Sequence, residues 1–180
     1  MEVEERRLVL EQLASSEARL QELVDGLTEE QWKFRERPDR WSIAEIIEHC
    51  ILFEEFIRGA IAKTLAGVAE PEKMAEVGKK EPLVLGLAEA RAIKFSAREA
   101  VRPVGRWTDR SELVAELRRV RARTVDFAAK SDASLREHFF PHIAFGDLDC
   151  YQWLVVLGQH AKRHALQIEE VKADAMFPSS

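Results

Sequence analysis

The chain has 180 residues, of which 46% are hydrophobic and 33% are charged. This length and composition predict one soluble domain, spanning residues 1–180, that can bury a sizeable core without disulfides. Because 32 acidic residues outnumber 27 basic ones and leave a net charge of −5, no basic surplus favours a nucleic-acid partner.

The first long amphipathic pattern predicts a helix from about Val3 to Gly26, with leucines such as Leu13 and Leu20 at helical spacing. A short capping-box pattern, "TEEQ", follows and predicts a second helix start around Trp32.

The next helix begins in "WSIAEII". Ser42 has the position of an N-cap and Glu45 that of the third helical residue, which together predict a capping box. Trp41 and Ile46 flank the cap as a hydrophobic staple would. We expect this helix to run to about Leu65, and its apolar stripe contains Ile46, His49, Phe53, Phe56 and Ala60.

Prolines and glycines interrupt residues 67–110, where the sequence predicts a long crossover segment with a short helix around Leu85 to Phe95. A third long helix is predicted from about Ser111 to Lys130. Within it, the arginine-rich run "RRVRAR" is interpreted as a solvated face, with an anion anchor as the lesser alternative.

The segment "FFPHIAFGDLD" is predicted to be a loop, and Asp149 with Gln152 to cap a last helix that reaches about Ala175. Residues 176–180 are expected to form a frayed tail. No strand is predicted. Four long amphipathic helices with a crossover between the second and the third long helix indicate an all-α four-helix bundle.

The chain gives no sign of export or membrane insertion. The N-terminus, "MEVEERRLVLEQL", has no apolar signal core, and the longest apolar run, "WLVVLG", is far shorter than a bilayer span. Cys50 and Cys150 cannot make a disulfide framework, which favours a reducing compartment. We therefore expect a cytoplasmic protein.

Three histidines lie in the apolar stripes of two helices. His160 and His164 are four residues apart on the last helix, so they share one face, and His49 lies in phase with the apolar residues of the second long helix. Buried imidazoles need hydrogen bonds or a metal ion, so the pattern fits either satisfied core histidines or three ligands with a fourth position open. Spacing alone does not decide, because His138 and His142 are also four apart, with Pro141 between them.

The same residues resemble the DinB-like (DinB/YfiT) family of four-helix bundle metalloproteins. "WSIAEIIEHC" is similar to the family's Trp-Ser-x-x-Glu-x-x-x-His motif, "HAKRH" to its His-x-x-Arg-His element, and "FGDLD" to the approach to its last helix. The likeness covers about residues 5–175. In "PHIAFG" the chain departs from the His-Pro that members often carry, so the family's substrate choice is not carried over.

The resemblance implies a divalent metal ion bound by His49, His160 and His164, zinc or nickel first and iron or manganese next. It also implies a small-thiol-dependent transferase or isomerase, with a low-molecular-weight thiol and a small electrophile as partners, and a homodimer. A metal-dependent hydrolase is the close variant, because an open position can also activate water. The competing hypothesis is a non-catalytic metal-binding or stress-related dimerisation module.

Other polar residues near these histidines have simpler explanations. Glu45 is accounted for by its capping role, and Cys50 points about 100° away from His49 and is expected to pack in the core. Arg163 is expected to pair with a carboxylate or to orient a ligand. Asp126 and Gln167 are candidates to hydrogen-bond a ligand histidine from outside.

Overall fold

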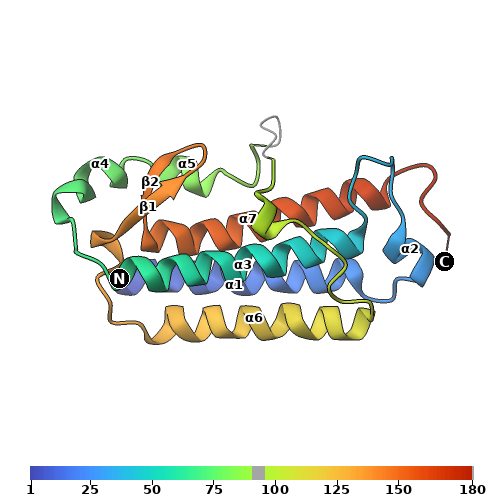
Figure 1. Cartoon of the computed structure of the whole chain (residues 1–180), viewed down its shortest axis with the longest axis horizontal. Coiled ribbons are helices and arrows are strands. Elements are labelled where there is room, and N and C mark those ends of the chain that lie inside the picture. Colours follow the sequence, from blue (N-terminus) through green and yellow to red (C-terminus); the bar gives the residue numbers. More distant parts are fainter. Residues whose placement is uncertain (91–95, 180) are drawn as a thin grey trace.

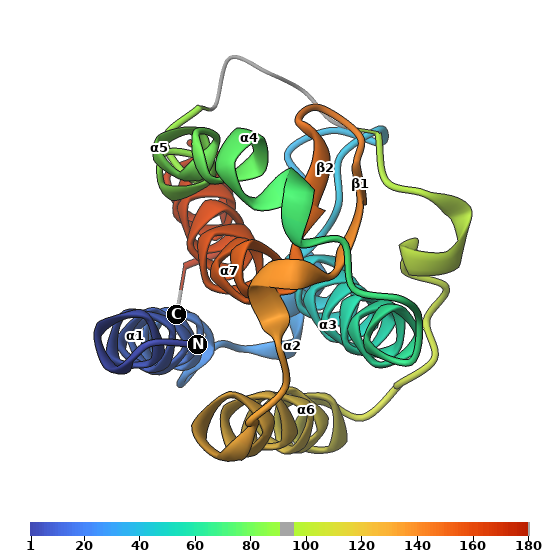
Figure 2. The ribbon, with the colours of Figure 1, turned by 90° about the vertical axis from the view of Figure 1, so that its left-hand side faces the viewer.

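Four long helices form the body of the protein in the computed structural model, which describes residues 1–90 and 96–179. They form a closed ring in which α1 packs on α6 and α7, and α3 packs on the same two helices (Figures 1 and 2). The all-α bundle predicted from the sequence is therefore confirmed. The long helices are α1 (Val3–Val24), α3 (Ile43–Leu65), α6 (Arg110–Lys130) and α7 (Cys150–Lys172), and a short α2 (Glu29–Lys33) joins the first two.

The direction of the helices explains the long crossover. In Figure 1, α3 and α6 lie side by side and run the same way, so the chain must return along the bundle between them. Residues 66–109 make this return. In the described part of this return, residues 66–90 and 96–109, the regular elements are two short helices, α4 (Met74–Gly78) and α5 (Glu81–Leu85), and two 3₁₀ turns, η1 (Pro71–Lys73) and η2 (Glu99–Val101). Part of the helix predicted over 85–95 falls on residues 91–95, outside the described residues, and the described short helix ends where that prediction begins.

Side-chain caps fix where the helices that carry the histidines begin. The Ser42 hydroxyl accepts a hydrogen bond from the Glu45 backbone N–H at 3.3 Å, and the Glu45 carboxylate accepts one from the Ser42 N–H at 2.8 Å. Asp149 and Gln152 make the same reciprocal pair at the start of α7. These capping boxes confirm the two predicted helix starts and set the rotational phase of the residues that follow.

The core consists of two apolar clusters stacked along the bundle. The first contains α3 residues up to Ile51 and α7 residues from Ala161 onward, whereas the second contains α3 residues from Ile57 and α7 residues up to Leu157. His49 and His164 lie within the α3 and α7 spans of the first cluster, and His160 directly precedes its first α7 residue, Ala161. No helix in the described part of the chain has the length and apolarity that a membrane crossing requires.

A β-hairpin replaces the loop that was predicted before the last helix. Strands β1 (Phe139–His142) and β2 (Gly146–Asp149) pair antiparallel, with Phe139 opposite Asp149. The prediction that the chain has no strand was wrong because the strands are only four residues long and one contains Pro141. The turn is closed by Gly146, whose φ of +64° suits glycine. Trp153 of α7 anchors the hairpin by stacking on Phe140 at 4.4 Å between ring centroids.

The interpretation of "RRVRAR" as a solvated face was wrong for one of its arginines. Arg121 is only 1% exposed, and its guanidinium pairs with Glu54 of α3 at 2.9 Å. The guanidinium also donates to the Leu13 carbonyl at 3.3 Å and the Ser16 hydroxyl at 3.4 Å. A charged link between α1, α3 and α6 thus lies inside the bundle.

The contact between α1 and α7 is close enough to require a glycine. A Cβ added at Gly158 would lie 3.0 Å from the Gln12 Cβ and 3.3 Å from the Gln12 carbonyl carbon. The Gly158→Ala variant gains about 1 kcal/mol of helix propensity but overpacks the interface by about 1–3 kcal/mol. We expect a net loss of up to about 2 kcal/mol in the free energy of unfolding, measured by urea denaturation.

Gly59 provides the matched control because a Cβ there meets nothing within 4 Å on the exposed side of α3. Gly59→Ala is expected to raise the free energy of unfolding by about 0.5–1 kcal/mol. Equal effects of the two substitutions would contradict the close helix contact.

Candidate metal site

His49 comes from the second turn of α3 and is held in place by contacts on two sides. Its side chain is only 4% exposed, and its ring lies 4.8 Å from the Trp41 ring, which precedes the helix cap. The Nδ1 atom of His49 lies 2.7 Å from the carbonyl oxygen of Val101 in η2. A carbonyl oxygen can only accept, so Nδ1 carries the proton and Nε2 of the neutral ring presents a lone pair.

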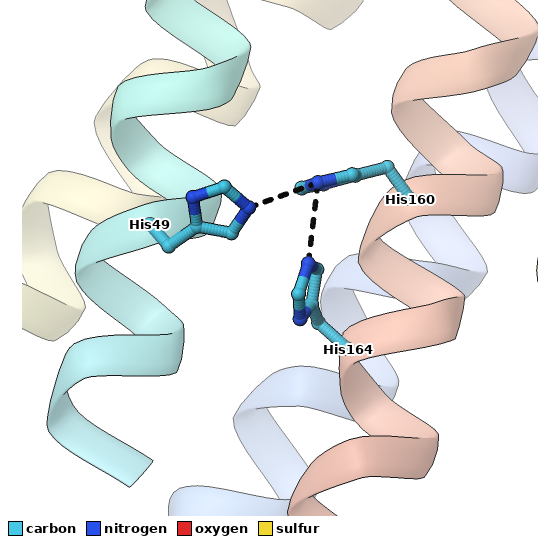
Figure 3. Close-up of side chains that lie close together, drawn as sticks. All are labelled: His49, His160 and His164. Carbon is cyan, nitrogen blue, oxygen red and sulfur yellow. Dashed lines mark hydrogen bonds between the residues drawn. The ribbon is translucent and has the colours of Figure 1, made fainter. Parts of the chain in front are cut away.

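His160 and His164 face His49 from successive turns of α7. The Nε2 atom of His160 lies 3.2 Å from the Nε2 of His49 and 3.2 Å from the Nε2 of His164, as Figure 3 shows. The Nδ1 of His164 donates to the Gln167 side-chain oxygen at 2.9 Å, so its Nε2 also presents a lone pair. The structure therefore brings all three predicted residues together, with one ring nitrogen of each turned toward a common point.

Burial favours the neutral form of His49 and His160. Desolvation lowers the pKa of His49, and the hydrogen bond to Val101 opposes that shift only partly. The pKa of His160 lies well below its usual value, first because of burial and then because His164 and His49 would repel a positive charge. The charges of Arg163 and Arg121 act in the same direction. Neutral imidazole is the form that binds metal ions, so the site is in its ligand form at neutral pH.

The donor set fits a divalent metal ion. The candidate ligand atoms of the three histidines all lie within 4.8 Å of one another. Two imidazole nitrogens bound to one tetrahedral zinc, at about 2.0–2.1 Å each, are separated by about 3.3 Å, close to the two Nε2 separations here. Within residues 1–90 and 96–179, the cluster contains no carboxylate or thiolate. Three protein ligands with a further position open are typical of catalytic metal sites.

Aromatic side chains line the site. The Phe53 ring, one turn after His49, stacks on His160 at 3.8 Å between centroids with an interplanar angle of 12°. Trp41 covers the other side of His49, and both aromatic rings are half-buried. Trp41 was predicted only as a staple with Ile46, and its contact with His49 adds a role beside the histidine cluster.

The other polar candidates have different outcomes. Gln167 was predicted to hydrogen-bond a ligand histidine from outside, and it accepts from His164 Nδ1. Asp126 had the same prediction, but it is exposed and pairs with Lys130. Arg163 donates to the backbone carbonyls of Leu87 and Ala90 and so ties the crossover to α7, contacts that its predicted roles did not include.

Cys50 is buried as packing, and burial raises the pKa of its thiol to about 12. The His138 and His142 pair lies outside the cluster. His138 Nδ1 donates to the Ser134 carbonyl, and the ring of His142 stacks on Phe145 at 4.7 Å.

Two partners of the site were missed from the sequence. The Val101 carbonyl is a backbone group and carries no side-chain signal. Glu48, next to His49, is 3% exposed and accepts hydrogen bonds from three successive backbone N–H groups of the crossover. The position of Glu48 beside the apolar stripe of α3 does not show that its carboxylate binds backbone groups more than 50 residues away.

A family model confirms the resemblance drawn from the two histidine motifs. The model described as the DinB superfamily matches residues 12–168. The chain belongs to the DinB superfamily. The chain is also similar to the uncharacterized protein YuaE of Bacillus subtilis strain 168, with 26% identity over 159 residues that cover 87% of this chain and 94% of YuaE.

A solved structure from Bacillus subtilis shares the fold. YfiT from Bacillus subtilis is described as a probable metal-dependent hydrolase with an unusual four-helix bundle topology. It superposes with a TM-score of 0.68 over 96% of this chain and 88% of its own, at 15% sequence identity. At this identity the likeness establishes the bundle topology.

Proposed function

We propose that this DinB-superfamily chain is a metal-dependent hydrolase whose ion is held by the Nε2 atoms of His49, His160 and His164. The observation that carries the proposal is the convergence of these three nitrogens, with the Nδ1 atoms of His49 and His164 engaged elsewhere. The description of YfiT as a probable metal-dependent hydrolase supports it. Imidazole ligands suit zinc, nickel, iron and copper, and of these zinc or nickel is the proposed ion.

The chain's own residues would hold and shield the reacting centre. When bound, a divalent ion supplies Lewis acidity and makes water a better nucleophile near neutral pH. Val101 and Gln167 hold the His49 and His164 rings in the tautomer that places a lone pair on Nε2, the atom that would bind the ion. Trp41 and Phe53 exclude water from two sides of the cluster and offer apolar surface to a substrate.

Metal analysis of protein purified without a histidine tag tests the site. We expect about one divalent ion per chain in the wild type and loss of that ion in the His160→Ala, His164→Ala double variant. The matched control is His138→Ala with His142→Ala, a second pair four residues apart that lies outside the cluster; this variant should keep its metal. Absence of metal from the wild type, or metal kept by the His160/His164 variant, would refute the site.

Activity screening then separates the candidate reactions. Loaded wild type should hydrolyse ester or amide substrates, and the His160/His164 variant should not. The same three nitrogens would also suit a small-thiol-dependent transferase, because a bound metal ion lowers the pKa of a thiol and keeps it as thiolate. If the loaded protein consumes added thiol together with a model electrophile but hydrolyses no substrate, the transferase assignment replaces the hydrolase assignment. Inactivity of the loaded protein in both screens would favour the non-catalytic module.

A further inference from the structure

Two adjacent residues of α3 hold two points of the same crossover segment. His49 binds the Val101 carbonyl, and Glu48 binds the backbone three to five residues further on. The Glu48 carboxylate accepts from the N–H groups of Val104 and Arg106 through Oε1 and from Gly105 through Oε2, each at 3.0 Å. Hydrogen bonds to a carboxylate are stronger than those between neutral groups.

The segment that Glu48 binds has no backbone ladder of its own to fix it. Residues 103–106 have no regular secondary structure, and the Val104 side chain is 79% exposed. In Figure 1 this yellow-green stretch runs past the outer side of α3 after the η2 turn. Among the described residues, three groups tie this stretch and its ends to the bundle: the buried Val101 side chain, the Glu48 carboxylate, itself 3% exposed, and Trp107, which packs against the first core cluster. Gly105, with a φ of +73°, lets three successive N–H groups converge on one carboxylate.

We propose that Glu48 is a positioning residue for the metal site: by anchoring residues 104–106, it holds the Val101 carbonyl where it fixes the tautomer and the orientation of His49. The inference rests on the proposed function, because it assigns Glu48 a role toward the same ion. Glu48 leaves α3 about 100° away from His49, so it acts through the segment and does not bind the ion itself. Removing a group that is hydrogen-bonded to a metal-ligating histidine, as Val101 is to His49, typically weakens metal binding by about 10–100-fold, which is the upper bound for an effect transmitted from Glu48.

The Glu48→Gln variant tests the proposal with two readouts. Glutamine keeps the size but has a single acceptor oxygen, and its amide group faces the N–H donors. In metal-free protein, ¹⁵N NMR of the His49 ring should show the Nδ1–H tautomer in the wild type and a mixture of tautomers in the variant. With Co²⁺ as the probe, the variant should bind more weakly, by up to about tenfold, with altered ligand-field absorption bands.

Glu55→Gln is the matched control, because Glu55 is on the same helix and its nearest charged partner is Arg119 at 3.7 Å, away from the crossover. It should leave both readouts unchanged. If Glu48→Gln does not fold, Gly105→Ala perturbs the segment from its exposed side, where a Cβ meets nothing within 4 Å but the backbone conformation is strained. It should produce the same changes in both readouts.

The outcomes separate this inference from the proposed function. Wild type that binds no Co²⁺ overturns the metal site as a whole. Wild type that binds Co²⁺, together with Glu48→Gln and Gly105→Ala variants that keep the His49 tautomer and the wild-type affinity, overturns only the role of Glu48.

Discussion

Replacing Arg121 by alanine is expected to lower the free energy of unfolding by about 3–5 kcal/mol. The substitution leaves the Glu54 carboxylate buried without its cation, 3% exposed in the middle of the bundle. Losing one partner of a buried pair is more damaging than losing both, because the remaining charge has no compensating partner. Urea denaturation of metal-free protein measures the change without interference from the histidine site.

The Arg121–Glu54 pair does not use all of its hydrogen-bonding atoms, which leads to a second expected result. Among the described residues, Glu54 Oε1 and Arg121 Nε have no hydrogen-bond partner although both atoms are buried. An Arg121→Met, Glu54→Leu double variant should therefore be near wild-type stability or up to about 4 kcal/mol more stable.

The exposed neighbour Arg119, which pairs with Glu116, is the control for Arg121, and Arg119→Ala should change stability by less than about 1 kcal/mol. Similar losses for Arg119→Ala and Arg121→Ala would show that Arg121 is not the buried member of the run.

The burial of Arg121 could have been predicted from helical phase. It lies four residues after Leu117 and three before Thr124, in step with the buried face of α6. Glu54 likewise lies four residues after Cys50 and three before Ile57, in step with the buried face of α3. The prediction of a solvated face followed the arginine-rich composition of "RRVRAR" and did not take the helical position of Arg121 into account. Opposite charges in the buried phases of two helices indicate an internal ion pair, because neither charge is stable there alone.

The histidine cluster was predictable because its residues lie on long helices. Capping boxes at Ser42 and Asp149 set the phase, and phase places His49, His160 and His164 on the inner faces. The parts that were missed depend on chain segments without such regularity. The Val101 carbonyl reaches His49 only because the crossover returns past α3, and the hairpin strands are too short to show a period.

Acidification of the metal-free protein from pH 6.5 to about 5.5 is expected to reduce its stability by up to about 1.4 kcal/mol per pH unit for each histidine with a depressed pKa. The pKa is depressed for His49 and His160, and also for His142, where burial and the charge of Arg98 lower it to about 4. Above pH 6.5 these rings are neutral in both states. Below it the unfolded chain takes up protons that the folded chain does not, so stability falls until the pH reaches the folded-state pKa values.

Urea denaturation in the presence of a chelator, at half-unit steps of pH, measures this slope. Carboxyl groups of the unfolded chain titrate near 4.5, so the range above pH 5.5 reports mainly on histidines. His142→Asn and His160→Asn should each reduce the slope by about one histidine's share, and a slope that is flat in the wild type would contradict the neutral, buried state of these rings. Only His160→Asn should also change metal release. Protons and metal ions compete for the same Nε2 lone pairs, so acid should displace the ion from His160 while the hairpin residue His142 has no part in holding it.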